Sequence, residues 1–300
     1  MGTAAEPRRA ELPLPGGREG ATVRLHPLLC AQMAAPPAFL HRVEGRLASM
    51  KAMGIRVPRE ELTEIPVVAF LVEHPAAGRI LVDTGFHPAV AVDPKQGLGL
   101  TGVVFKDVRM DPGQAVPAQL RKREIDPTSV STVVMTHLHN VQASGIAEFP
   151  GATFVLSAQE WDAASGGRQT DGYIRRQYDH AFDYRTLDFE ATEVDSFATF
   201  GRSLDLFGDG SVRMVFTPGH TAGHCSVILR LKGREALLTG DAAYTMQTIS
   251  GSRLPYKMED EHLFKRSLRE IQLYLEGRPD TLVVPGHDME AWRRLDAICE

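Results

Sequence analysis

The sequence has few cysteines and no pairing pattern among them. Cys30, Cys225 and Cys299 are the three cysteines of the 300 residues, and no two form a C-x-x-C motif. An odd number of widely spaced cysteines does not suit a disulfide framework and favours a reducing compartment. We therefore expect a cytoplasmic protein whose thiols have no catalytic role.

Long apolar runs and an excess of positive charge are also missing. No run reaches the roughly 18 apolar residues of a membrane span, and the first twenty residues lack the apolar stretch of a secretory signal. Lys and Arg number 33 against 38 Asp and Glu, without a basic block. These absences argue against membrane and nucleic-acid partners. We expect a disordered arm over residues 1–20 and a single domain over residues 21–300.

What is present is an ordinary globular composition with 43% hydrophobic residues, enough for a sizeable core. Apolar runs bounded by Gly and Pro predict strands over residues 22–33, 65–73, 79–82, 131–136, 152–157, 213–217, 225–231, 235–239 and 281–284. Helical composition and spacing predict helices over residues 44–53, 117–125, 158–164 and 259–275. Residues 86–113 and 166–200 hold no period, and we expect these loops to shape a substrate pocket.

The order of these elements predicts the fold class. Strands come first and last in both halves, with helices between them. This order suits an α/β (α+β) four-layer αββα sandwich of two mixed sheets better than a doubly wound parallel sheet.

Four histidines and one acid follow directly after predicted strands. His137 and His139 form a His-x-His pair, His220 and His287 each follow a Pro-Gly dipeptide, and Asp241 ends a fourth strand. On a loop leaving a strand, residues two apart point the same way, so both rings of the pair can reach one ion. Imidazoles and a carboxylate gathered from several strand ends are typical of catalytic zinc sites.

The motifs that contain these residues resemble those of the metallo-β-lactamase-fold superfamily. In chain order they are Asp83-Thr84-Gly85, Thr136-His137-Leu138-His139, Thr217-Pro218-Gly219-His220, Gly240-Asp241 and Pro285-Gly286-His287-Asp288. The segment Asp241-Ala242-Ala243-Tyr244 and the closing Gly-His-Asp are most similar to the N-acyl homoserine lactonase-like branch. The resemblance spans about residues 67–288 and implies an αββα sandwich with metals on one edge between the sheets.

The chain departs from that family at the second metal. The resemblance implies that His137, His139 and His220 hold one ion, with Asp241 as a shared ligand. The family signature His-x-His-x-Asp-His continues here with Val141 and Gln142, so the second position keeps Asp241 and His287 alone. A valine cannot ligate and a neutral amide is a poor zinc ligand. We predict one zinc ion, with iron or manganese as alternatives.

One such ion lowers the pKa of bound water to about 7 and so provides metal-bound hydroxide at neutral pH. This chemistry favours hydrolysis of an ester, lactone or thioester, in a small-molecule or carrier-bound substrate, over hydrolysis of an amide. We assign catalytic roles to Asp241 as base, Tyr244 as hydrogen-bond donor to the substrate carbonyl, and His287 as acid, base or clamp. Asp83 is expected to brace the metal loops, and His224 to support a ligand.

Two other readings fit the same residues. Two histidines and Asp241 can form the facial triad of a mononuclear iron oxygenase. The loss of the aspartate and histidine at Val141 and Gln142 also fits a catalytically silent or binding member of the fold. The sequence names neither the substrate nor the oligomeric state.

Overall fold

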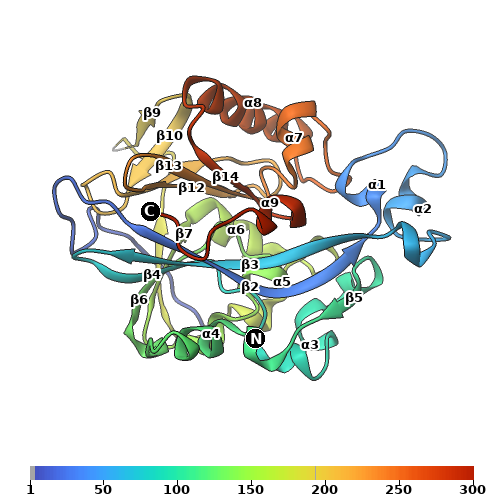
Figure 1. Cartoon of the computed structure of the whole chain (residues 1–300), viewed down its shortest axis with the longest axis horizontal. Coiled ribbons are helices and arrows are strands. Elements are labelled where there is room, and N and C mark those ends of the chain that lie inside the picture. Colours follow the sequence, from blue (N-terminus) through green and yellow to red (C-terminus); the bar gives the residue numbers. More distant parts are fainter. Residues whose placement is uncertain (1–3, 193) are drawn as a thin grey trace.

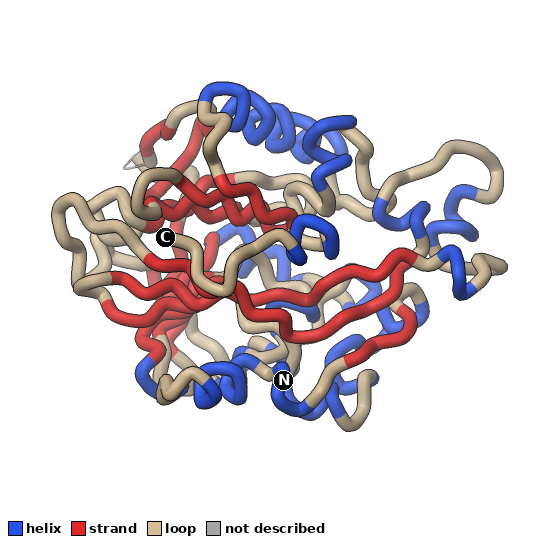
Figure 2. The backbone as a smooth tube through the Cα atoms, viewed as in Figure 1, coloured by secondary structure: helices blue, strands red, loops and turns tan. Residues whose placement is uncertain are grey.

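The computed structural model describes residues 4–192 and 194–300. Two mixed sheets stack face to face, and helices cover their outer faces, as Figures 1 and 2 show. The predicted αββα sandwich is therefore confirmed. Among the described residues, no helix combines the length and the apolar character that crossing a membrane requires.

The first sheet has eight strands in the order β1-β8-β7-β6-β4-β3-β2-β5. The pairs from β4 through β6 and β7 to β8 are parallel, whereas β2, β3 and β4 pair antiparallel. The strands are β1 (Arg8–Arg9), β2 (Arg24–Ala35), β3 (Thr63–His74), β4 (Gly78–Val82), β5 (Lys106–Arg109), β6 (Val130–Val134), β7 (Thr153–Ser157) and β8 (Asp183–Leu187).

The second sheet has six strands in the order β14-β13-β12-β11-β10-β9. Only the β13 and β14 pair within this described sheet is parallel. The strands are β9 (Asp195–Phe197), β10 (Phe200–Asp205), β11 (Val212–Phe216), β12 (Cys225–Arg230), β13 (Glu235–Gly240) and β14 (Leu282–Pro285).

The helices flank these sheets and are mostly short. They are α1 (Pro37–Leu40), α2 (Ala48–Ala52), α3 (Lys95–Leu98), α4 (Val116–Lys122), α5 (Asn140–Ala143), α6 (Ala158–Gly166), α7 (Met246–Gly251), α8 (Glu261–Gly277) and α9 (Met289–Arg293). The longest, α8, begins after Asp260, whose carboxylate accepts the backbone N–H of Leu263 at 2.9 Å. This confirms the helix predicted there, shifted by two residues.

Alternation along the strands builds three apolar layers. In β13, for example, Ala236 and Leu238 face the other sheet, whereas Leu237 faces α8. The outer face of the first sheet is covered by α4 and α6 in the same way. The site edge is therefore fixed by buried strands on both sides.

The N-terminal arm corrects an expectation. Residues 1–3 lie outside the described residues, but Arg8 and Arg9 pair parallel with β8, and the Asp179 carboxylate accepts the backbone N–H of Ala4 at 2.7 Å. From Ala4 onward the arm is thus held against the domain. A two-residue strand has no periodicity, and the residue that pairs with Arg8 is the distant Arg185. No local pattern in the sequence therefore predicts this pairing.

The two aperiodic segments also contain more structure than expected. Residues 86–113 include α3 and the edge strand β5, which pairs with β2, and residues 166–200 include β8 and β9. β10 was not predicted, and the helix expected over residues 44–53 is reduced to α2. β5 and β9 lie at the edges of their sheets, where charged side chains such as Arg109 and Asp195 interrupt the apolar pattern of a strand.

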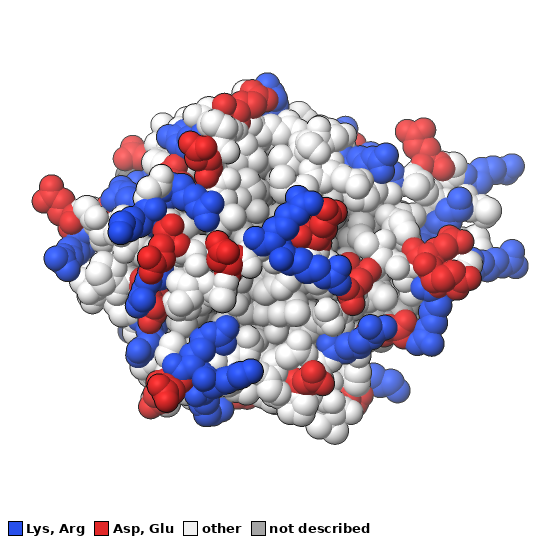
Figure 3. All heavy atoms as spheres, in the orientation of Figure 1, with Lys and Arg blue, Asp and Glu red and all other residues white. Residues whose placement is uncertain are grey.

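The surface carries charges of both signs. On the face drawn in Figure 3, Lys and Arg are interspersed with Asp and Glu. That face lacks the broad basic patch that nucleic-acid-binding proteins use. The three cysteines are buried and unpaired.

Candidate metal centre

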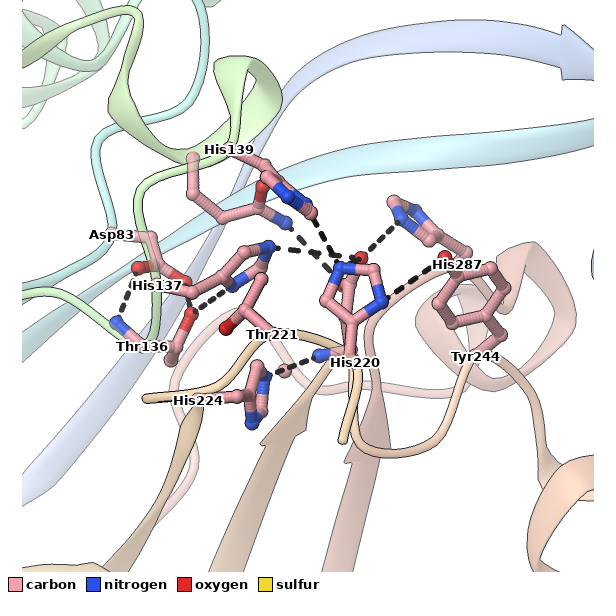
Figure 4. A network of polar contacts seen from close by, with 12 residues as sticks. Asp83, Thr136, His137, His139, His220, Thr221, His224, Tyr244 and His287 are labelled. Carbon is pink, nitrogen blue, oxygen red and sulfur yellow. Dashed lines mark hydrogen bonds and ion pairs between the residues drawn. The ribbon is translucent and has the colours of Figure 1, made fainter. Parts of the chain in front are cut away.

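The predicted metal ligands meet at one edge of the sandwich. His137 and His139 lie between β6 and α5, His220 lies between β11 and β12, and Asp241 directly follows β13. One ring nitrogen from each of the three histidines lies within 4.8 Å of the others. Figure 4 shows these rings pointing toward one another. The structure thus brings together residues that are up to 104 positions apart in the sequence.

The ring of His137 is oriented by a chain of hydrogen bonds. The Thr136 hydroxyl donates to Oδ2 of Asp83 at 2.8 Å, so its oxygen accepts from Nδ1 of His137 at 3.0 Å. Nε2 of His137 is then left with its lone pair facing the cluster. This atom is buried and has no hydrogen-bond partner among the described residues. A ring nitrogen prepared in this way fits a metal ion.

The other donor atoms are equally close. Nδ1 of His139 lies 2.9 Å from Nε2 of His220, and Oδ2 of Asp241 lies 3.2 Å from Nε2 of His220 and 3.8 Å from Nε2 of His137. Three imidazoles and one carboxylate therefore converge. This is a donor set that zinc and other first-row divalent ions accept.

Burial sets the charge states of the cluster. It holds the pKa values of His137 and His139 well below their usual range and lowers the pKa of His220 to about 4. Burial raises the pKa of Asp241, but the surrounding histidines outweigh it and the pKa lies well below its usual range. Neutral imidazoles beside an ionised carboxylate are the forms that bind a metal.

Asp83 and His224 support the cluster from behind, as the sequence predicted. Besides the hydroxyl bond, Asp83 accepts the backbone N–H of Thr136 at 2.9 Å. Nε2 of His224 accepts the backbone N–H of Asp241 at 2.9 Å, and its Nδ1 donates to the carbonyl oxygen of Thr217 at 3.2 Å. These bonds fix the backbones that carry two of the ligands.

The two further residues assigned to catalysis also border the cluster. Oη of Tyr244 lies 3.4 Å from Nδ1 of His220, and its ring packs edge-on against His287. Nε2 of His287 lies 3.3 Å from Oδ2 of Asp241, and its Nδ1 lies 3.3 Å from the carbonyl oxygen of Pro66. The Asp241 carboxylate thus stands between His220 and His287.

The position of the expected second ion has a different composition. Val141 and Gln142 lie on α5 and are buried. Nε2 of Gln142 donates to Oδ1 of Asp241 at 3.4 Å, and its Oε1 has no hydrogen-bond partner among the described residues. A cavity of about 20 Å³ borders these two residues, Asp241 and His287, which is room for about one water molecule. These side chains do not fit a second transition-metal ion, because one is apolar and the other is a neutral amide.

The centre is covered by two segments that are far apart in the sequence, one around Gly172 and one around Phe39. Gly172, at φ 109°, lies so close to the His139 ring that an added Cβ would stand 2.6 Å from Cδ2. Phe39, on α1, stacks on Tyr244 with ring centroids 6.1 Å apart. The first segment belongs to the loop predicted to shape the pocket, whereas the role of α1 was not predicted.

Sequence reasoning missed one buried acid, Glu160. Its backbone N–H bonds to the Ser157 hydroxyl at the start of α6, so the sequence Ser-x-x-Glu reads as an ordinary helix cap. The carboxylate, however, accepts from Leu138, Tyr173 and Thr221. No local sequence pattern distinguishes a glutamate at the start of an ordinary helix from a buried carboxylate that accepts hydrogen bonds from distant segments.

Comparison with known proteins agrees with this geometry. The family model of the Metallo-beta-lactamase superfamily matches residues 62–287. N-acyl homoserine lactonase AttM of Rhizobium radiobacter is 35% identical over 237 residues, which cover 76% of this chain and 84% of that protein. A probable metallo-hydrolase of Mycobacterium tuberculosis, Rv2300c, is 28% identical over 86% of this chain and 83% of that protein.

Solved structures share the fold at lower identity. Bacillus thuringiensis AiiA, in a mutant form with N-decanoyl-L-homoserine bound at its active site, superposes with a TM-score of 0.73 at 20% identity, covering 92% of this chain and 97% of that one. AidC, described as a dizinc quorum-quenching lactonase, gives a TM-score of 0.58 at 14% identity over 92% and 90% of the two chains. Because the family model matches most of the chain and its motifs converge at one edge, the chain belongs to the metallo-β-lactamase superfamily.

Proposed function

We propose that this protein is a metal-dependent hydrolase of lactones or related esters and thioesters, with one zinc ion held by His137, His139, His220 and Asp241. The observation that carries the proposal is the buried Nε2 of His137, which has no hydrogen-bond partner among the described residues and faces two further imidazoles and a carboxylate. The similarity to N-acyl homoserine lactonase AttM, at 35% identity, supports a lactone as the first substrate to test.

The proposal of a single ion rests on α5. At the second position the neutral Gln142 and the apolar Val141 leave Asp241 and His287 as the ionisable groups. Two ions about 3.5–4 Å apart would bring four positive charges together, and a valine and an amide supply no compensating charge. The amide N–H of Gln142 instead holds Oδ1 of Asp241, so Oδ2 is the oxygen that faces the histidines.

An ion held by His137, His139, His220 and Asp241 would lower the pKa of water and polarise a carbonyl, which would make a nucleophile available at neutral pH. This chain's own residues do the rest. Asp241, ionised and beside the reacting centre, accepts the proton of the attacking water.

Tyr244 acts on the substrate oxygen. When Nε2 of His220 faces an ion, Nδ1 of that ring carries the proton and donates to Oη of Tyr244. The phenol hydrogen is then free to donate to the oxygen that gains negative charge during attack. Burial raises the pKa of Tyr244 well above its usual range, so the phenol keeps its proton at neutral pH.

His287 holds the far side of the same carboxylate. Burial lowers its pKa, but the Asp241 carboxylate outweighs burial and the net pKa is raised. A protonated His287 keeps Asp241 in place and returns a proton to the leaving alcohol or thiol.

The test combines metal content with turnover. Protein purified without added metal is analysed for zinc, iron and manganese, and then assayed with N-acyl homoserine lactones, aryl esters and acyl thioesters. We expect zinc and lactone opening by the wild type, loss of both in His139→Ala, and retention of both in His262→Gln, whose ring lies on the exposed face of α8. Iron together with oxygen uptake would favour the oxygenase, and absence of metal and turnover would favour a silent module.

A further inference from the structure

The Glu160 carboxylate is buried beside the loops that carry the proposed metal ligands, and the proposed hydrolysis gives it no role. The side chain is fully buried on the first turn of α6. Oε1 accepts the backbone N–H of Leu138 at 2.8 Å and the Tyr173 hydroxyl at 3.2 Å, and Oε2 accepts the Thr221 hydroxyl at 2.6 Å. Three segments that are far apart in the sequence therefore donate hydrogen bonds to one carboxylate.

Each of these partners stands next to a metal ligand. Leu138 lies between His137 and His139, and Thr221 directly follows His220. The Tyr173 ring packs on the His139 ring with centroids 4.8 Å apart, and the two residues also form an isolated β-bridge. The hydrogen bonds of the Glu160 carboxylate that the described residues show thus go to neighbours of the three histidines and not to the histidines themselves.

Burying a carboxylate costs free energy, so the position of Glu160 requires an explanation. Burial raises the pKa of Glu160 to about 7, although the three donors lower it. Replacing a buried polar network with apolar side chains is often neutral for stability or stabilising. The close approach of Gly223, whose added Cβ would stand 1.9 Å from the Glu160 backbone nitrogen, shows that the loop carrying His220 is packed directly on α6.

We propose that Glu160 is a positioning residue of the metal centre, which sets the spacing of His137, His139 and His220 through Leu138, Tyr173 and Thr221. The proposal rests on the proposed function in requiring that these histidines bind an ion. It adds that the affinity for the ion depends on a carboxylate that does not touch it.

The test measures Co²⁺ affinity by competition with a chelator, together with the visible spectrum of the Co²⁺ protein. Glu160→Gln keeps the shape and one acceptor oxygen but loses the acceptor for Thr221, and we expect about tenfold weaker binding and an altered spectrum. Glu160→Leu removes every acceptor and should weaken binding by about 100-fold. Tyr173→Phe removes one bond and should have a smaller effect than either.

A matched pair elsewhere in the fold supplies the control. The Glu235 carboxylate accepts the Tyr274 hydroxyl at 2.7 Å on the α8 side of the second sheet. Glu235→Gln and Tyr274→Phe delete the same kind of bond and should leave Co²⁺ affinity unchanged, even where they lower the unfolding temperature.

The outcomes separate this inference from the proposed function. If the wild type binds Co²⁺ and Glu160→Gln and Tyr173→Phe bind it equally well with unchanged spectra, Glu160 has a structural role alone and the inference fails. A wild type that binds no Co²⁺ overturns both proposals. Should Glu160→Leu fail to fold, the two conservative variants decide the question.

Discussion

The proposed metal position at His137, His139 and His220 and the neighbouring position at His287 differ in the hydrogen bonds that their side chains make. At the first position, hydrogen bonds from His137 through Thr136 to Asp83 leave Nε2 of His137 without a hydrogen bond to any described residue and aimed at two more imidazoles. At the second, both ring nitrogens of His287 have partners, on Asp241 and Pro66. A metal site is recognised by ligand atoms that are neutral, held in one orientation and without a hydrogen-bond partner. The number of histidines alone does not identify such a site.

Removal of a ligand at the first position should have the largest effect. His220→Ala deletes one of three imidazoles, and we expect more than 100-fold weaker zinc binding. Mutation of residues that only hydrogen-bond to metal ligands already lowers metal affinity by about 10- to 100-fold. Elemental analysis and lactone opening are the readouts. Full metal content in this variant would show that His220 is not a ligand.

The residue that borders both positions should affect turnover without affecting metal content. Tyr244→Phe removes a hydroxyl near His220 but keeps the ring against His287. We expect kcat to fall about 100-fold, as for loss of an oxyanion donor, with unchanged zinc content. Tyr274→Phe is the control, and equal turnover in the two variants would remove Tyr244 from the reaction.

Removing the hydrogen bonds that orient His137 should make the first position bind metal more weakly and so reduce its difference from the second. Thr136→Val keeps the shape but removes the hydroxyl that fixes the His137 tautomer, and we expect about tenfold weaker metal binding. Thr132→Val makes the same change on β6, outside the site. Unchanged affinity in Thr136→Val would show that the ring is oriented by packing alone.

The smallest effect concerns the pH dependence of stability of the metal-free protein. The pKa of Glu160 is raised to about 7 by burial, so between its unfolded pKa near 4.3 and this value the folded state binds more protons. Its contribution to the free energy of unfolding is therefore full below about pH 4.3 and falls as pH rises to about 7. Glu160→Gln removes this term, and its stability relative to the wild type should rise with pH across that window. Urea unfolding at several pH values measures the difference, and parallel curves would contradict it.

Much of this centre could be predicted because its ligands follow strands. A strand end fixes where a side chain emerges, so His137, His220 and Asp241 are visible as strand, turn and ligand in the sequence. Glu160 and the arm around Arg8 could not be found this way. Their partners lie on segments far away in the sequence, and contacts of that kind leave no local period.

The covering segments show the same limit. The loop containing Gly172 was expected near the pocket because it lacks a period, but its contact with the His139 ring depends on tertiary packing. Phe39 lies in a Pro-rich stretch without any chemical motif. Composition marks such segments as irregular and does not say what they cover.

Metal stoichiometry tests the central claim most directly. We predict one equivalent of zinc for the wild type, set by α5, and two equivalents for the double variant Val141→Asp/Gln142→His, which restores a carboxylate and an imidazole beside Asp241 and His287. Two equivalents in the wild type would contradict the single-ion account, and a metal-free wild type in the presence of excess zinc would contradict the metal centre itself.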